Sequence, residues 1–241
     1  ESLVATQERL GAGIQRVLDV CLPLPAERSD RARAVRRTAA WAERAKAAHR
    51  RRDDQALFGI VQGGTDAALR RESAQRTVAL DFDGYAIGGL SVGEERGPMM
   101  GALEAAIAEL PADQPRYLMG VGDPRSMIEA VARGVDMFDC VLPTRLGRHG
   151  TLLTDRGRVN AKRAEFSRSD RPIDPACACS VCATYSAGYL RHLLVVGEPA
   201  GKTLCALHNL AWMLAFVDRM RAAIAAGTLD ALRSEVAAVW A

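Results

Sequence analysis

The sequence predicts an α/β protein in which helices cover a parallel sheet. Short apolar runs recur over the first 142 residues, and a helical pattern follows each of them. Because these runs stay apolar at successive positions, both faces of each strand are expected to be buried, which is typical of parallel sheets. After Leu142 the alternation stops, and the remaining chain holds basic loops, a cysteine cluster and two helices.

The expected elements follow from these patterns in chain order. Strands are expected at 17–22, 57–62, 84–90, 117–121 and 137–142. Helices are expected at 27–51, 65–79, 98–110, 124–133, 202–226 and 229–240. The second strand breaks at Gly63 and Gly64, and Thr65 is expected to cap the helix that follows.

Two architectures fit this alternation, a doubly wound open sheet and a (β/α)8 barrel. No G-x-G-x-x-G turn follows any strand, which disfavours the dinucleotide-binding form of the open sheet. In a barrel the carboxyl ends of the strands form the active face. Polar or glycine residues stand at or near those ends, namely Asp19, Gln62, Gly88, Gly89, Gly120 and Asp139. Five strands do not close an eight-stranded barrel, so we expect either a fragment or further strands in weakly patterned segments.

Three cysteines and one histidine form the most specific local pattern. Cys177, Cys179 and Cys182 lie in a tight C-A-C-S-V-C turn, and His208 lies in the first turns of an expected helix. Three thiolates and one imidazole are the ligands of a closed, tetrahedral, structural Zn²⁺ site. The alternative is disulfides or free thiols, which the close spacing and the low cysteine density disfavour. The other three cysteines are expected to be ordinary thiols in apolar surroundings: Cys21, Cys140 and Cys205.

The composition is that of an ordinary globular chain, with 49% hydrophobic and 25% charged residues in 241. No segment resembles a signal peptide, and no apolar run approaches membrane-spanning length. With the cysteines interpreted as thiols and metal ligands, a reducing, cytoplasmic location is expected.

The net charge of the chain is only +3, so positive charge can matter only where basic residues are concentrated. One basic group follows the fifth strand: Arg145, Arg148, Arg156, Arg158, Lys162, Arg163, Arg168 and Arg171. A dense basic segment of this kind, in expected loops, favours contact with nucleic acid.

Three motifs precede the cysteine cluster in order along the chain. They are FGIVQGG at 58–64, GGLSVGE at 88–94 and DMFDCVLPTR at 136–145. In register with the cysteines and the histidine, these motifs resemble the tRNA-guanine transglycosylase (queuine tRNA-ribosyltransferase) family over essentially the whole chain. The resemblance implies a (β/α)8 TIM barrel, incomplete in this chain, with a C-terminal zinc-binding subdomain. Residues 1–145 would carry the base pocket and the nucleophile, and 146–241 the basic loops, the zinc and the last helices.

The resemblance also implies the activity. The family exchanges guanine at wobble position 34 of certain tRNAs for a 7-deazaguanine, in queuosine biosynthesis, through a covalent Asp–ribose intermediate. Asp139 is similar to the nucleophile that attacks ribose C1′, and a carboxylate suits an oxocarbenium-like transition state. A strand-end carboxylate that caps the next segment is the structural alternative. The implied partners are the tRNA anticodon loop, the free 7-deazaguanine base and a second copy of the chain in a homodimer.

The resemblance also implies a role in base binding for individual residues of this chain. Asp19 is similar to the carboxylate that accepts hydrogen bonds from N1–H and the exocyclic amine of guanine. Gln62 and the backbone N–H of Gly89 are expected on the other edge, with Leu90 beside them, and Met119 as an apolar wall. A tight strand exit is the alternative for the glycines, and a core position is the alternative for Met119.

Two segments resemble the RNA-contacting loops of the family, although they could also be ordinary solvated loops. The first consists of Gly120, Val121, Gly122, Asp123, Pro124, Arg125 and Ser126. The second consists of Thr144, Arg145, Leu146, Gly147 and Arg148. Glycines expose backbone N–H groups, a helix that starts at Pro124 offers its dipole, and arginines bind phosphates.

Two features depart from the family pattern. A Ser-Gly-Gly-Phe-Gln segment, which in the family carries the general acid/base aspartate, does not occur in this chain, so we expect a fragment or a chain whose upstream part is not shown. Val20 stands where bacterial relatives often have a second acid. Cys21 and Val92 resemble the bacterial type, which uses the 7-aminomethyl precursor instead of queuine. The alternatives are a non-catalytic tRNA-binding zinc subunit of this family and an inactive fragment.

Overall fold

The computed structural model describes residues 1–240, which divide into two compact units. The first unit contains Glu1–Val121 and Glu129–Asp139. The second contains Gly122–Ile128 and the chain from Cys140 onward.

A five-stranded parallel sheet forms the centre of the first unit. Its strands are β1 (Ile14–Arg16), β2 (Ala56–Val61), β3 (Gly84–Ile87), β4 (Arg116–Leu118) and β5 (Met137–Phe138). The strands lie in the order β1-β2-β3-β4-β5, and each pairs in parallel with the next. A doubly wound sheet reverses its strand order at a switch point, whereas this order runs in one direction. The sheet is therefore singly wound and has the topology of half a barrel.

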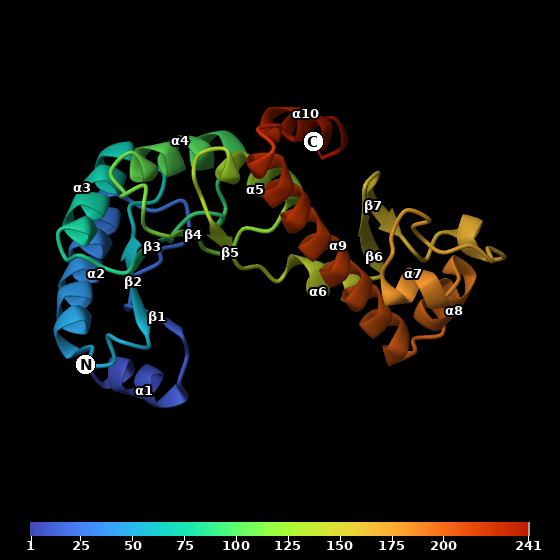
Figure 1. Cartoon of the computed structure of the whole chain (residues 1–241), viewed down its shortest axis with the longest axis horizontal. Coiled ribbons are helices and arrows are strands. Elements are labelled where there is room, and N and C mark those ends of the chain that lie inside the picture. Colours follow the sequence, from blue (N-terminus) through green and yellow to red (C-terminus); the bar gives the residue numbers. More distant parts are fainter. Residues whose placement is uncertain (241) are drawn as a thin grey trace. The chain divides into compact units, whose positions relative to one another are not determined.

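Helices of the first unit lie beside the sheet. They are α1 (Ser2–Leu10), α2 (Arg28–Ala48), α3 (Ala67–Val78) and α4 (Arg96–Ile107), whereas α5 (Pro124–Val131) is divided between the two units. Figure 1 shows α2, α3 and α4 in a row beside the sheet, and α2 and α3 both contact β2. All residues of β3 and nearly all of β2 are buried. The prediction of strands that are apolar on both faces is confirmed for these two.

The first strand lies earlier than predicted, so the prediction of a strand at 17–22 is wrong. Ile14 to Arg16 pair with Ala56 to Phe58, and the N–H of Val17 makes the last contact, 3.1 Å from the carbonyl oxygen of Phe58. The polar Gln15 is the inward-facing residue of β1 and is only 2% exposed. Because the buried position is polar and its neighbours are exposed, β1 lacks the apolar run that marks a central strand.

The cap of α3 also differs from the prediction. Asp66 caps this helix, and its Oδ1 accepts hydrogen bonds from the N–H groups of Ala68 at 3.0 Å and Leu69 at 3.1 Å. Thr65 was expected in this role. An aspartate is the better acceptor for the unpaired N–H groups of a first turn, and the helix begins one residue later as a result.

The second unit is built on one long helix. It contains α6 (Leu142–Arg148), the antiparallel hairpin β6 (Thr151–Thr154) and β7 (Gly157–Asn160), the 3-10 turn η1 (Ala164–Phe166), α7 (Ser180–Thr184), α8 (Ala187–Val195), α9 (Pro199–Ala225) and α10 (Leu229–Val239). The predicted amino ends of the last two helices, α9 and α10, lie within three residues of the observed ones. His208, expected in the first turns of its helix, lies in the third turn of α9.

Residues 144–148 form a helix, so the prediction of a loop there is wrong. Pro143 lies in the first turn of α6, where a proline costs no hydrogen bond. Gly147 lies against the backbone of α9, and a Cβ at this position would stand 2.5 Å from the nitrogen of Ala206. Pro143 therefore begins the helix, and Gly147 allows its close contact with α9.

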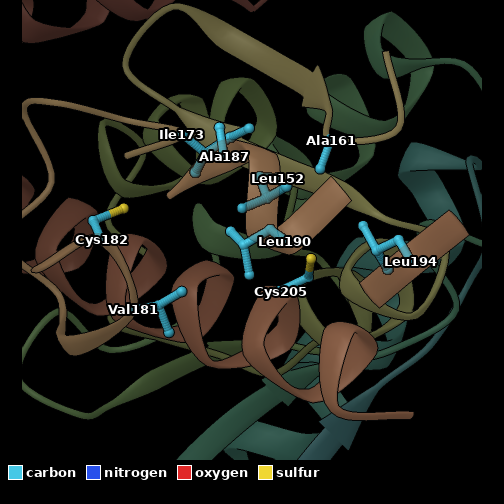
Figure 2. Close-up of a cluster of buried hydrophobic side chains, with 9 residues drawn as sticks. All are labelled: Leu152, Ala161, Ile173, Val181, Cys182, Ala187, Leu190, Leu194 and Cys205. Carbon is cyan, nitrogen blue, oxygen red and sulfur yellow. The ribbon is translucent and has the colours of Figure 1, made fainter. Parts of the chain in front are cut away.

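Figure 2 shows the buried hydrophobic cluster of the second unit. Its members are Leu152, Ala161, Ile173, Val181, Cys182, Ala187, Leu190, Leu194 and Cys205. They come from the hairpin, from α7, α8 and α9, and from the segments between them. Across residues 1–240, no helix is both long and apolar enough to span a membrane.

Candidate active site and metal centre

Six residues were predicted to bind the base or attack the ribose; five of them each follow the carboxyl end of a different parallel strand, and the sixth, Leu90, comes directly after Gly89. Gln62, Met119 and Asp139 come directly after β2, β4 and β5, Gly89 is the second residue after β3, and Asp19 is the third after β1. Since all strands are parallel and neighbours in order, their carboxyl ends share one edge of the sheet. The structure thus places these five residues along one edge, each at a different strand.

Asp19 and Gln62 contact each other directly. The Gln62 side-chain amide donates a hydrogen bond of 2.6 Å to Oδ2 of Asp19. Gln62 is 2% exposed, and its backbone N–H donates to the Ser73 hydroxyl at 2.9 Å. Asp19 is half-buried. A carboxylate and an amide that lie this close can hydrogen-bond both donors and acceptors of one planar ligand.

The backbone after β3 lies against these two side chains. Gly89 has φ +65°, in the left-handed region that favours glycine, and a Cβ there would lie 2.3 Å from Oε1 of Gln62. Leu90 is buried at 3% exposure. The thiol of Cys21 borders the same segment. Desolvation raises the pKa of this thiol and the Asp19 carboxylate adds to the rise, whereas a hydrogen bond from the Gly89 backbone opposes it. Cys21 is exposed as a residue, so the expected apolar surroundings are wrong for it.

Arg70, on α3, lies behind this segment and was not predicted from the sequence. It is 0% exposed. Its guanidinium donates hydrogen bonds to four backbone carbonyl oxygens: Gly64 at 2.7 Å, Val61 at 3.2 Å, Gly88 at 2.7 Å and Gly89 at 3.0 Å. Burial lowers the pKa of Arg70 to about 9. An arginine on a polar helix looks like a solvent-facing residue, so no signal in the sequence distinguishes it from Arg71 beside it.

Asp139 is exposed, and one of its two oxygens is held by two donors. The Tyr117 hydroxyl donates to Oδ1 at 2.6 Å, and the backbone N–H of Gly120 donates to the same oxygen at 2.9 Å. Within the described part of the first unit, Oδ2 has no hydrogen-bond partner. The carboxylate is therefore oriented through one oxygen while the other stays available.

Tyr117 is the second residue that the sequence did not reveal. Burial and the hydrogen bond to Asp139 raise the pKa of Tyr117 to about 12, so the hydroxyl keeps its proton at neutral pH. Arg16 lies over the tyrosine ring at 5.5 Å and donates to the hydroxyl oxygen at 3.3 Å. A tyrosine inside an apolar strand is usually a core residue, and only the parallel register with β5 brings it to Asp139.

The two predicted RNA-contacting segments differ in exposure. Arg145 and Arg148 are exposed on α6, whereas Gly147 is buried against α9. In the first segment, Asp123 caps α5 and accepts a hydrogen bond from the N–H of Ser126 at 3.0 Å. Four members of that segment are buried: Val121, Gly122, Pro124 and Ser126.

Cys177, Cys179, Cys182 and His208 converge as predicted. Their donor atoms all lie within 4.8 Å of one another. The three sulfurs lie 3.7, 3.5 and 3.3 Å from Nδ1 of His208. Tetrahedral zinc with ordinary Zn–S and Zn–N bonds separates sulfur from nitrogen by about 3.6 Å. The residues therefore fit a tetrahedral metal ion, and all six cysteines of the chain are free of disulfides.

The neighbours of His208 orient its ring. Nε2 lies 2.8 Å from the carbonyl oxygen of Leu153, so this nitrogen carries the proton and Nδ1 offers its lone pair to the sulfurs. Asn209 is fully buried and was not predicted. It accepts a hydrogen bond from the N–H of Leu153 at 2.8 Å and donates to Pro143 and Thr151, both at 2.9 Å. Two successive residues of α9 thus fix the helix to the hairpin and α6. A His-Asn pair inside an apolar helix is the signal that could have revealed this role.

The protonation of the cluster also fits a metal centre. Burial lowers the pKa of His208, which keeps the imidazole neutral. Burial and the neighbouring cysteines raise the pKa of the Cys182 thiol. Three thiols crowded into one partly buried site repel each other once they ionise, and a divalent cation relieves this repulsion.

Fold and site together define a class: a singly wound α/β protein with carboxylates at the strand ends and a Cys3His cluster that could hold a metal ion. A family model described as "Queuine tRNA-ribosyltransferase" matches residues 1–241. Similar curated proteins named queuine tRNA-ribosyltransferase come from Symbiobacterium thermophilum (50% identity over 240 residues, 100% of this chain and 60% of the relative), Bacillus subtilis (49% over 235 residues, 98% and 62%) and Moorella thermoacetica (50% over 232 residues, 96% and 62%). The chain belongs to the queuine tRNA-ribosyltransferase family. It spans about 60% of the length of these relatives.

Proposed function

We propose that this protein is a tRNA-guanine transglycosylase that exchanges guanine at position 34 of tRNA for a 7-deazaguanine. The observation that carries the proposal is the placement of Asp19, Gln62, Gly89 and Asp139 at the carboxyl ends of neighbouring parallel strands. In barrel enzymes this edge bears the catalytic groups. The family membership supports the same activity, because the similar proteins carry the name of that enzyme.

Asp139 is the proposed nucleophile. Its free Oδ2 attacks ribose C1′, the bond from C1′ to N9 of guanine breaks, and the electron pair leaves with the base, which takes up a proton. The reverse sequence with a 7-deazaguanine releases Asp139 and completes the exchange. The hydrogen bonds from Tyr117 and Gly120 to Oδ1 favour attack by Oδ2, because an oxygen that accepts two hydrogen bonds is the weaker nucleophile.

Asp19 and Gln62 are the proposed recognition pair for the base. The Asp19 carboxylate accepts hydrogen bonds from N1–H and the exocyclic amine, while Gln62 and the Gly89 N–H bind the opposite edge. Leu90 borders the same edge, and Met119 is the apolar wall. The hydrogen bond between Asp19 and Gln62 supports this assignment, since it keeps both side chains at the same place before a base binds.

The Cys3His centre is proposed to hold structural Zn²⁺. With four protein ligands the ion has no open position, so its contribution is to fix α7 and the segment before it to α9 and not to catalyse a step. The anticodon stem-loop is proposed to bind to the exposed Arg145 and Arg148 and to the segment 120–126, which leads into α5.

The proposed incoming base is the 7-aminomethyl precursor. The proposed assembly is a homodimer, which sedimentation would detect.

The activity is tested by following labelled guanine into tRNA. We expect incorporation into a transcript with guanine at position 34, and no incorporation when adenine stands there. A covalent protein–RNA adduct should be visible on a denaturing gel. Binding of tRNA without base exchange and without a covalent adduct would contradict the proposal. It would assign the protein to the non-catalytic subunits of the family.

A further inference from the structure

Arg70 is buried in an arrangement that stability alone does not explain. Its charge is completely removed from water, and within residues 1–240 no carboxylate forms an ion pair with it. The Glu94 carboxylate acts on Arg70 through space and opposes the desolvation that lowers its pKa, but it forms no direct contact. A buried charge without a direct ion pair is costly, and an apolar side chain in its place would avoid the cost. The four hydrogen bonds to backbone carbonyls offset this cost, so the orientation of those carbonyls is the feature that Arg70 provides.

The bonded carbonyls lie on both sides of the proposed base pocket. Val61 and Gly64 flank Gln62 in the chain, and Gly88 and Gly89 form the segment after β3. One planar guanidinium therefore connects the ends of two neighbouring strands. Its donors have a fixed fork geometry, so the positions of the four oxygens are set relative to one another.

The direction of two N–H groups follows from these bonds. The peptide bonds after Gly88 and Gly89 are trans, because the one cis bond in the described chain is Leu24–Pro25. In a trans peptide the N–H points opposite to the C=O. Since Arg70 holds both carbonyls on its own side, the N–H groups of Gly89 and Leu90 point away from it. The bond from the Gly89 backbone to the Cys21 thiol agrees with this direction.

The Leu90 N–H has no hydrogen-bond acceptor within residues 1–240, although Leu90 is buried, and the Gly89 N–H has only the thiol of Cys21, which is a weak acceptor. Such groups are normally paired, so a ligand atom is the expected acceptor. We propose that Arg70 is a positioning residue that fixes the specificity of the pocket: it orients the Gly89 and Leu90 N–H groups toward an acceptor on the base edge opposite Asp19. This inference rests on the proposed function.

The test compares Arg70→Lys with the parent protein for three free bases. Lysine keeps the positive charge but presents all donors on one atom, so it does not span both glycine segments. Guanine and 6-thioguanine differ only at the acceptor that faces the N–H groups, while hypoxanthine lacks only the amine that faces Asp19. We expect Arg70→Lys to reduce the preference for guanine over 6-thioguanine by about three- to tenfold, as for one hydrogen bond. The preference for guanine over hypoxanthine should not change.

A matched control is Arg71→Lys, an exposed neighbour on α3, which should keep both preferences. If Arg70→Lys lowers both preferences together, or neither, Arg70 has only a structural role and the inference is overturned. Failure of the proposed function gives a different result, because the parent protein itself would then show no preference for guanine over either analogue.

A measurement on the parent protein applies even if Arg70→Lys does not fold. In NMR spectra, guanine should shift the amide signals of Gly89 and Leu90, and 6-thioguanine should shift them less. The Nε–H of Arg70 should stay protected from solvent exchange with and without base. Unchanged amide signals on guanine binding, or a rapidly exchanging Nε–H, would overturn the inference.

Discussion

The strand-end edge of the first unit and the Cys3His centre of the second hold their polar groups in opposite ways. At the edge, Asp139 is exposed, Asp19 is half-buried and hydrogen-bonds to Gln62, and each residue comes from a different strand. In the metal centre, His208 is 0% exposed, and three sulfurs converge on one of its nitrogens. The edge can exchange its internal hydrogen bonds for those of a ligand, whereas the metal centre suits one permanent ion.

The difference shows how the same few residue types serve binding or stability. Exchangeable hydrogen bonds need access to solvent and an oriented backbone, which Arg70 provides from behind the sheet. A structural ion needs burial and a complete ligand set. Variants at the edge should therefore change activity more than stability, and variants in the centre should do the reverse.

The largest expected effect is that of Asp139→Asn on the exchange of guanine. The amide is a poor nucleophile and carries no charge to stabilise the oxocarbenium, so the rate should fall by at least about 10⁴-fold. The covalent adduct should disappear while tRNA affinity persists, because phosphate contacts dominate binding. Rates of labelled guanine incorporation measure this, and an active Asp139→Asn variant would remove Asp139 from its role.

Cys182→Ser should remove the metal and lower the free energy of unfolding by more than about 4 kcal/mol, as loss of a structural metal does. Metal analysis of the purified protein and denaturant unfolding check both effects. Cys21→Ser makes the same chemical change at an exposed position and should alter stability by less than about 0.5 kcal/mol. Equal stability of the two variants, or a parent protein without zinc, would contradict the assignment.

Asp19→Ala should weaken binding of the free base strongly and of tRNA only slightly. The variant leaves two donors of the base without their charged acceptor, a loss of about 1.5–3 kcal/mol. Calorimetric titration with guanine measures it, with the exposed Asp113→Ala as the control. An equal loss of affinity for base and tRNA would show that the change affects the fold and not the pocket.

Tyr117→Phe tests the orientation of the nucleophile. The variant removes one of the two donors to Oδ1 of Asp139 but keeps the carboxylate, so the adduct should still form, about tenfold more slowly. Single-turnover adduct formation is the measurement. A rate equal to that of the parent would mean that the Gly120 N–H alone suffices.

Arg148→Ala should have the smallest effect. It should weaken the binding of tRNA and not of the free base, which is the reverse of the pattern expected for Asp19→Ala. Loss of one phosphate contact should weaken tRNA binding modestly and reduce its logarithmic salt slope by about one, with free-base affinity unchanged. Arg221→Ala, at an exposed position on α9, is the control. If both arginine variants change the slope equally, the effect reports general charge and α6 has no special contact.

Much of the candidate site could be predicted from local patterns. Gln62 ends an apolar run, Asp139 interrupts one, and the spacing of Cys177, Cys179 and Cys182 is itself a ligand pattern, so each signal lies within a few residues. The position of β1 could not be predicted, because its inward residue Gln15 is polar and its pairing with β2 is a long-range property. The helical state of 144–148 was hidden by Gly147, which is explained only by the backbone of α9.

By itself, the sequence determined the alternation of strands and helices, the residues at the strand ends and the metal ligands. These depend on chain-local quantities: the run of apolar residues, the strand length and the spacing of donor atoms. Only the tertiary structure decided that the sheet is singly wound, that Arg70 hydrogen-bonds the glycine segments and that Tyr117 and Gly120 share one oxygen of Asp139. The physical reason is that these hydrogen bonds join residues far apart in the chain, and their partners meet only once the parallel register is set.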